Sequence, residues 1–261
     1  MIETVEVTRY VTPLREGGSL PGVVEAADLG TYVCKFRGAG QGVKVLVAEV
    51  IVSALARALE VATPRLVALD LPAELARYEA DEEVQDLLRA SVGLNVGVDF
   101  LPGAFGFDAT GGAAAEQSAD EAALDFAATV LWLDAFTGNP DRTWRNPNLL
   151  RWHGRIWLID HGASLYFHHA WTDRVGDPGA WANRAWSDEG HVFGAHAASA
   201  RRIDASLRAR VADAVSDALA DVPDAWLTGV GGASPEELRD GYARYLGARL
   251  ESTSWLPGEP L

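Results

Sequence analysis

Residues 137–162 read TGNPDRTWRNPNLLRWHGRIWLIDHG, and this segment carries the most informative pattern of the chain. A polar loop that contains Asp141 and, five residues later, Asn146 follows an apolar helical segment. An expected hairpin over residues 148–159 comes next, and Asp160 stands at the end of its second strand. The pattern therefore predicts a carboxylate–amide loop on one side of the hairpin and a strand-terminal carboxylate on the other.

An Asp-x-x-x-x-Asn loop followed by a strand-terminal Asp is the arrangement that phosphoryl transfer from ATP needs. One carboxylate orients or deprotonates the acceptor hydroxyl, while an amide oxygen and a second carboxylate hold the magnesium that neutralises the phosphates. Taken alone, the spacing of Asp141 and Asn146 fits a turn with helix-capping residues equally well. The sequence Asp160-His161-Gly162 at compatible spacing favours the phosphoryl-transfer interpretation.

A lysine stands in the predicted strand over residues 31–37, in a chain whose 22 basic residues include only two lysines. Strand alternation places Lys35 and Val33 on one face and Cys34 and Phe36 on the other. Cys34 and Phe36 are expected to pack under the helix that follows. Lys35 is then expected to point into a cleft.

That helix is expected over residues 44–60, and it embeds one carboxylate, Glu49, among apolar neighbours. A carboxylate in such surroundings usually has a charged or hydrogen-bonding partner. A cleft lysine paired with a helix glutamate is how kinase-like folds fix an ammonium group on the α- and β-phosphates of ATP. The other interpretation makes Lys35 a solvated edge residue and Glu49 an exposed helix residue, which fits the apolar neighbours of Glu49 less well.

Composition and charge limit the classes of partner. The chain has 261 residues, 48% of them apolar and 23% charged, which is ordinary for a globular protein and unlike disordered or fibrous chains. Its net charge of −15 repels phosphate backbones and anionic lipid, so neither a nucleic acid nor a membrane is expected as a direct partner. A single cysteine and an N-terminus without a visible secretory signal predict a cytoplasmic location.

Glycine, proline and apolar periodicity divide the chain into three segments. Residues 1–95 are expected to form a small strand-rich lobe, and residues 120–261 a larger helical lobe that includes the hairpin. Residues 96–119 between them are rich in glycine and proline and are the best candidate for a connector. Helices are also expected near residues 71–95, 121–136, 199–221 and 235–251. A ligand is expected in the cleft between the lobes.

These motifs together resemble the HipA-like kinase family, a bacterial branch of the protein-kinase and phosphoinositide-kinase superfamily. The resemblance covers residues 5–220 and is greatest to a short actinobacterial-type subgroup. The segments that carry it are GGSLP at 17–21, YVCKFRGAGQG at 32–42, NPDRTWRNPNLL at 139–150 and WLIDHG at 157–162.

The resemblance implies an α+β, two-lobed protein-kinase-like fold. The small N-lobe is expected to hold an antiparallel sheet and one main helix, and the larger C-lobe to be mostly helical. ATP as substrate, Mg²⁺ as cofactor and a Ser or Thr hydroxyl of an unidentified protein as acceptor are implied as well. The residue roles that the resemblance carries over are Asp141 as catalytic aspartate, Asn146 and Asp160 as metal ligands, Lys35 as phosphate ligand supported by Glu49, Val33 in the adenine ceiling, and Ser19 as a phosphate contact or autophosphorylation site.

The sequence departs from the family pattern in its phosphate loop and around the catalytic aspartate. The Ser-x-x-Gly-x-Gln-x-Lys phosphate loop of the larger, toxin-type members is absent, and residues 17–20 are its nearest substitute. Asn139 stands two positions before Asp141, where protein kinases carry His or Tyr, and no lysine follows Asp141. Arg142 and Arg145 are the nearby cations and are expected to steady the γ-phosphate.

Two other functions stay open from the sequence. A small metabolite or a lipid headgroup could accept the phosphate, since related kinase-like folds share the same residues. The chain could also be a nucleotide-binding pseudokinase that regulates a partner. Other patterns are weaker, because the glycines at 38–42 lack the spacing of a dinucleotide or Walker loop and the six histidines lack that of a structural zinc site.

Overall fold

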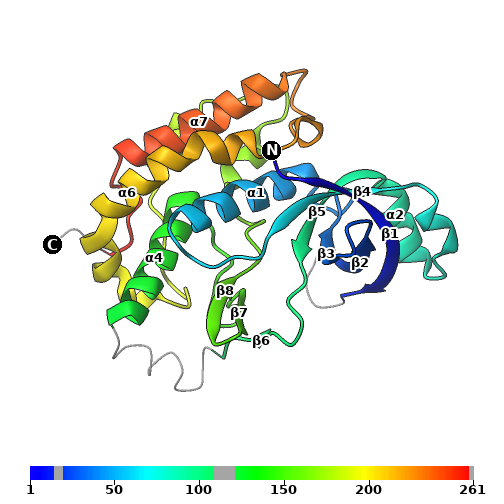
Figure 1. Ribbon diagram of the computed structural model, residues 1–261. Helices are drawn as coiled ribbons and strands as arrows, with labels where there is room; N and C mark the ends of the chain where they lie inside the picture. Colours follow the sequence, from blue (N-terminus) through cyan, green and yellow to red (C-terminus); the bar gives the residue numbers. More distant parts are fainter. Residues whose placement is uncertain (15–19, 109–120, 259–261) are drawn as a thin grey trace.

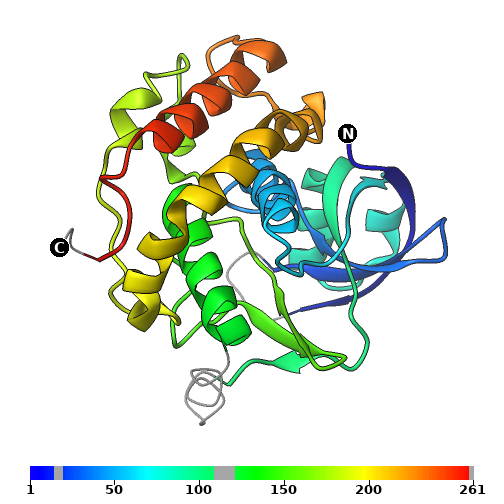
Figure 2. The ribbon, with the colours of Figure 1, turned by 60° about the vertical axis from the view of Figure 1, so that its left-hand side comes forward.

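The chain folds into a strand-rich N-terminal region followed by a helical C-terminal region (Figure 1). The structure is a computed structural model and describes residues 1–14, 20–108 and 121–258. Seen from a second direction, the barrel strands gather on one side of the molecule and the long helices on the other (Figure 2). The predicted mixed α+β class is confirmed.

Five strands of the N-terminal region close into a barrel in the order β1-β2-β3-β5-β4. They are β1 (Thr4–Pro13), β2 (Gly22–Ala26), β3 (Thr31–Lys35), β4 (Leu66–Leu71) and β5 (Gly93–Asp99). Neighbouring strands run antiparallel except β1 and β4, which run parallel. The antiparallel sheet expected for this region is thus closed on itself by one parallel pair, which the long crossover between β3 and β4 makes possible.

Buried apolar side chains such as Val5 fill the barrel, and α2 (Glu82–Ala90) contributes to the same cluster. Cys34 and Phe36 belong to this cluster as well. The expectation that they pack under the helix after β3 is therefore wrong. That helix lies on the other face of β3, where Lys35 contacts it.

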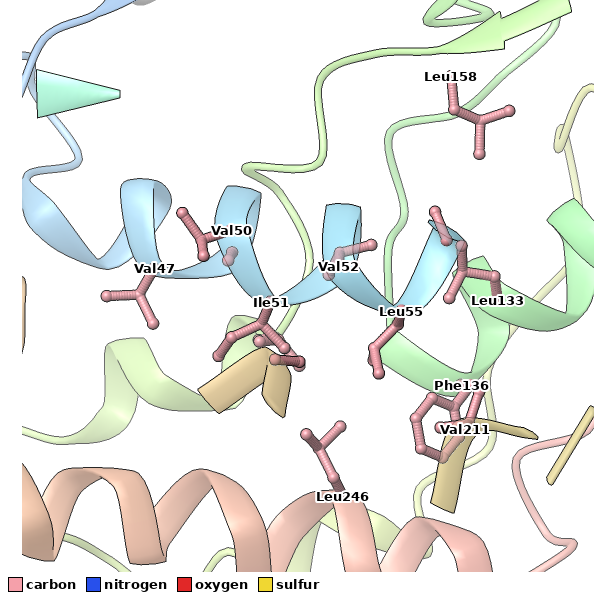
Figure 3. Close-up of a cluster of buried hydrophobic side chains, with 14 of the residues drawn as sticks. Val47, Val50, Ile51, Val52, Leu55, Leu133, Phe136, Leu158, Val211 and Leu246 are labelled. Atoms are coloured by element: carbon pink, nitrogen blue, oxygen red, sulfur yellow. The ribbon is translucent and has the colours of Figure 1, made fainter. Parts of the chain in front are cut away.

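The helical core contains α1 (Val43–Ala58), α4 (Glu121–Thr137), α6 (Ala197–Ala220) and α7 (Pro235–Glu251). α1 is apolar around most of its circumference, which is typical of a helix buried on all sides. Its side chains pack against strands of the barrel and against the C-terminal helices, and Leu55 lies in one cluster with Phe136, Val211 and Leu246 (Figure 3). This packing fixes Glu49, in the middle of α1, relative to the C-terminal region.

The hairpin and the long C-terminal helices agree with expectation. β7 (Leu149–Trp152) and β8 (Arg155–Leu158) form the hairpin, and β6 (Phe105–Gly106) pairs with β7. The predicted helices near 121–136, 199–221 and 235–251 correspond to α4, α6 and α7. The short helical turns are η1 (Leu75–Tyr78), η3 (Tyr166–Ala170), α5 (Gly179–Ala182), η4 (Gly194–His196) and η5 (Asp224–Trp226). None of the helices in the described ranges is long and apolar enough to cross a membrane.

The N-terminal region differs from expectation in three places. The strand β1 has no counterpart among the predicted elements. The helix expected over residues 71–95 is confirmed only at α2, and this segment ends inside β5. The segment 96–119, expected to connect two lobes, begins inside β5 as well, so its first residues pair with β3 and β4.

Candidate active site

Three charged side chains from separate elements meet at one point. Lys35, the last residue of β3, donates from Nζ to Glu49 Oε2 of α1 at 2.8 Å and to Asp160 Oδ1 at 2.7 Å. Glu49 is buried, whereas the side chain of Asp160, just beyond β8, is 50% exposed. The predicted pairing of Lys35 with Glu49 is confirmed, and Asp160 joins it.

The two carboxylates determine the charge of this cluster. Burial alone would lower the pKa of Lys35, but the attraction of Glu49 and Asp160 outweighs burial and raises that pKa above its ordinary value. The Lys35 ammonium in turn lowers the pKa of Asp160. At neutral pH Lys35 is therefore a cation and Asp160 an anion.

Glu49 also holds the turn that follows Asp160. The backbone N–H of His161 donates to Glu49 Oε2 at 2.9 Å, so one carboxylate oxygen receives both this group and the Lys35 ammonium. Asp160 has a φ of 57°, a left-handed conformation that Asp and Asn adopt more readily than most residues. These contacts tie α1 to the turn that carries Asp160.

Gly162 allows α1 to approach this turn closely, and its replacement tests the contact. A Cβ at this position would lie 2.4 Å from Val45 Cγ1 and 3.6 Å from Glu49 Oε2. We expect Gly162→Ala to lower the free energy of unfolding by about 1–3 kcal/mol in a urea titration, the usual cost of overpacking. Gly106→Ala is the control, because a Cβ there meets no atom within 4 Å. Equal stability of the two variants would contradict the close packing.

Asp141 lies in the loop between α4 and β7, and three asparagines hold it. Asn146 and Asn148 each donate from Nδ2 to Asp141 Oδ2 at 3.1 Å. On the other side, the Asp141 backbone N–H donates to Asn139 Oδ1 at 3.0 Å. The structure brings Asp141 and Asn146 together as predicted. It adds Asn148, which no spacing rule indicated.

A cavity of about 230 Å³ lies at this site. Lys35, Asp141 and Asp160 form its charged wall, and the glycine-rich residues 39–42 form another. Asn146 is hydrogen-bonded to Asp141 and so belongs to the same group. The four polar side chains that the sequence places in one site therefore converge in the fold.

The other two predicted nucleotide contacts are Val33 and Ser19. Val33 is partly buried on the Lys35 face of β3 but is not among the residues that line the cavity. Ser19 lies outside the described residues. The roles proposed for both stay predictions.

Comparison with known families agrees with this geometry. A family model described as HipA-like kinase matches residues 7–232, which is most of the chain. The chain belongs to the HipA-like kinase family. Comparison with the curated proteins finds no match. Membership in this family supports a kinase-type phosphotransferase activity, and the class generally uses ATP and a divalent metal.

The donor atoms of this HipA-like kinase suit a magnesium ion that is shared with phosphate. Mg²⁺ takes oxygen ligands, commonly one or two carboxylates together with substrate phosphates. Asp160 offers a half-exposed carboxylate. Asn146 donates its amide N–H to Asp141, which leaves its amide oxygen for a metal. Among the described residues, no group of three or more His, Cys, Asp or Glu side chains converges as a metal site. A site with few protein ligands, completed by phosphate oxygens, is compatible with that finding.

Arg142 does not take the role expected from its position. It is fully buried, and it donates from Nε to Asp134 Oδ2 and from Nη1 to the carbonyl of Asn148, both at 2.6 Å. Since its guanidinium is enclosed and outside the cavity lining, the expected contact with the γ-phosphate is wrong. Arg145 is exposed, with its guanidinium 4.5 Å from the ring centre of Trp144.

Asp134 is a buried charged residue next to the site that the sequence patterns did not single out. It lies in the apolar helix α4 with no exposed surface, and it is the partner that Arg142 requires. The signal was present in the sequence, because Asp134 is a carboxylate among apolar neighbours, as Glu49 is.

Proposed function

We propose that this HipA-like kinase is an ATP- and Mg²⁺-dependent phosphotransferase that acts on a Ser or Thr hydroxyl of a protein. The observation that carries the proposal is the convergence of Lys35, Asp141 and Asp160 on one cavity. In this proposal residues 1–95 and 120–261 act as the two lobes of a protein-kinase-like fold. Residues 96–119 join the lobes, with their first part built into the barrel as β5.

Lys35 binds the α- and β-phosphates in the proposed complex. Its ammonium is already oriented by Glu49 and Asp160, and Glu49 keeps that orientation because it is buried. Val33, on the same face of β3, is the proposed contact of the adenine ring. Ser19 is proposed to contact phosphate or to become phosphorylated.

Asp141 aligns the acceptor hydroxyl in the proposed transfer. Because Asn146 and Asn148 hold Oδ2, Oδ1 is the oxygen left to accept a hydrogen bond from that hydroxyl. The acceptor oxygen forms a bond to the γ-phosphorus, the bond from that phosphorus to the β–γ bridging oxygen breaks, and ADP leaves. The hydroxyl proton passes to Asp141 and then to solvent. Mg²⁺, held by Asp160 and Asn146 when bound, neutralises charge on the phosphates.

Transfer from γ-labelled ATP tests this proposal. The purified chain is incubated with the label, Mg²⁺ and cell lysate, and labelled proteins are mapped by mass spectrometry with Asp141→Ala as control. Label on a Ser or Thr that depends on Asp141 supports the proposal. Turnover with purified metabolites or lipid headgroups alone would identify a small-molecule kinase. Tight binding of MgATP with neither transfer nor phosphate release over hours would identify a pseudokinase.

Glu49→Gln isolates the contribution of the Lys35–Glu49 pair. The amide keeps an oxygen for the His161 N–H but removes one of the two negative charges beside Lys35. We expect kcat/KM for ATP to fall about tenfold, measured as release of labelled phosphate from γ-labelled MgATP. Glu60→Gln is the matched control, because Glu60 follows α1 and is exposed. A wild-type kcat/KM in Glu49→Gln would remove Glu49 from the nucleotide site.

A further inference from the structure

Asp134 is a fully buried carboxylate near the C-terminal end of α4. Its Oδ2 accepts from Arg142 Nε at 2.6 Å and from His191 Nε2 at 3.0 Å, and its Oδ1 accepts from Asn139 Nδ2 at 2.8 Å. Burial alone would raise the pKa of Asp134, but Arg142 and His191 outweigh burial and lower it. Asp134 is therefore an ionised carboxylate whose two oxygens both receive hydrogen bonds.

Two of these donors flank Asp141 in the sequence. Asn139 precedes Asp141 by two residues, and its Oδ1 accepts a hydrogen bond from the Asp141 backbone N–H. Arg142 follows Asp141 directly and also donates to the carbonyls of Asn148 and Ile159. Asn148 in turn donates to Asp141 Oδ2, and Ile159 directly precedes Asp160. One carboxylate thus fixes the loop on both sides of Asp141.

The third donor comes from the irregular segment before α6. The backbone N–H of Phe193 donates to His191 Nδ1 at 3.1 Å, so the ring proton is assigned to Nε2, which faces Asp134. In the same segment, Trp186 Nε1 donates to the carbonyl of Asn139 at 3.1 Å. This segment therefore packs on the loop that carries Asp141 and encloses Asp134.

We propose that Asp134 is a positioning residue for the transfer reaction, and that it acts through Asn139 and Arg142 to place Asp141 against the acceptor hydroxyl. The inference rests on the proposed function, which assigns the acceptor to Asp141. A misplacement of about 1 Å costs on the order of 100-fold in rate, so the loop needs anchors on both sides of the reacting group. If Asp134 and Arg142 served only to fill the interior, uncharged side chains of similar size would do so equally well.

Two variants separate positioning from stability. Asp134→Asn keeps the shape of the side chain but leaves Arg142 as an unpaired buried charge, so it is expected to lower the thermal midpoint. The double variant Asp134→Asn/Arg142→Met removes that charge, and its midpoint is expected to recover toward wild type. Asp204→Asn is the matched control, because Asp204 binds the Arg208 guanidinium in α6, away from the cavity lining.

Each variant is characterised by its thermal midpoint, by kcat and KM for phosphate release from γ-labelled MgATP to water, and by hydrogen exchange of the Asp141 amide. We expect kcat to fall about 100-fold in both the single and the double variant, with KM for ATP unchanged. The Asp141 amide, which donates to Asn139, is expected to exchange faster in both. Asp204→Asn is expected to lower the midpoint and to leave kcat and the Asp141 amide as in wild type.

A double variant with wild-type kcat and a protected Asp141 amide would overturn the proposal and leave Asp134 with a structural role only. Should Asp134→Asn fail to fold, the double variant still gives this answer. If the chain is instead a pseudokinase, the result looks different, because the wild-type chain then releases no label. The exchange rate of the Asp141 amide still reports in that case whether Asp134 holds the loop.

Discussion

Asp141→Asn is expected to reduce phosphate transfer by about a thousandfold while ATP binds as in wild type. Asn146 and Asn148 both donate N–H to Asp141 Oδ2, so the oxygen of the substituted amide has to take that position. The NH₂ group of the amide then stands where Oδ1 stood. An NH₂ group accepts neither a hydrogen bond nor a proton from a hydroxyl. The variant therefore keeps the loop but loses the alignment of the acceptor.

The rate of label transfer reports the alignment of the acceptor. The affinity for MgADP, measured by titration calorimetry, reports nucleotide binding. Asp213→Asn serves as the control for the loss of one negative charge, because Asp213 is exposed on α6. Transfer at the wild-type rate by Asp141→Asn would exclude the assigned role. Loss of MgADP affinity together with a lower thermal midpoint would show that Asp141 mainly shapes the loop.

The segment 137–162 could be interpreted from sequence because its elements are local. Strand alternation, the polar turn and the apolar strand before Asp160 are all encoded within a short stretch. The pairing of Lys35 with Glu49 follows from rules of the same kind. Alternation gives the face of the strand, and a carboxylate on an apolar helix requires a partner.

Closure of the barrel could not be predicted in this way. The pairing of β1 with β4 joins Thr4 to Ala68, and no local pattern encodes so distant a contact. In β5 the glycines are typical of a loop, which favours the connector interpretation. The structure gives another reason for Gly97, because a Cβ there would lie 2.7 Å from the side chain of Leu69. This glycine serves close packing inside a strand.

The wrong role expected for Arg142 and the failure to single out Asp134 have one cause. A cation next to Asp141 looks available to phosphate because the sequence shows polarity but does not show burial. Asp134 stands in the apolar run LWLDAF at 131–136 and meets the criterion that identified Glu49. Applied to both helices, that criterion predicts a buried partner for Asp134, and Arg142 is the nearest cation that follows it in sequence.

Asp160→Asn is the second change for which we expect a large effect. An amide oxygen is neutral and binds Mg²⁺ more weakly than a carboxylate, and Lys35 keeps only Glu49 as its anionic partner. We expect transfer to fall about a thousandfold at a fixed Mg²⁺ concentration, or ~4 kcal/mol in the activation free energy.

The dependence of the rate on Mg²⁺ concentration identifies the cause of that loss. For Asp160→Asn the half-saturating Mg²⁺ concentration is expected to rise, whereas for Asp141→Asn it is expected to stay at the wild-type value. The comparison is matched, because both variants replace a carboxylate by an amide in the same cavity. An unchanged Mg²⁺ dependence in Asp160→Asn would contradict its assignment as a metal ligand.

Asn is the informative replacement at this position because of the backbone. Asp160 has a φ of 57°, which Asn adopts at little cost and Ala does not. Asp160→Ala is therefore expected to lose about 1–2 kcal/mol of unfolding free energy that Asp160→Asn retains. If both variants are inactive and only the Ala variant is less stable, the activity loss belongs to the carboxylate and the stability loss to the backbone. An equal loss of stability in both would mean that the ion pair with Lys35 stabilises the fold, and part of the activity loss would then be structural.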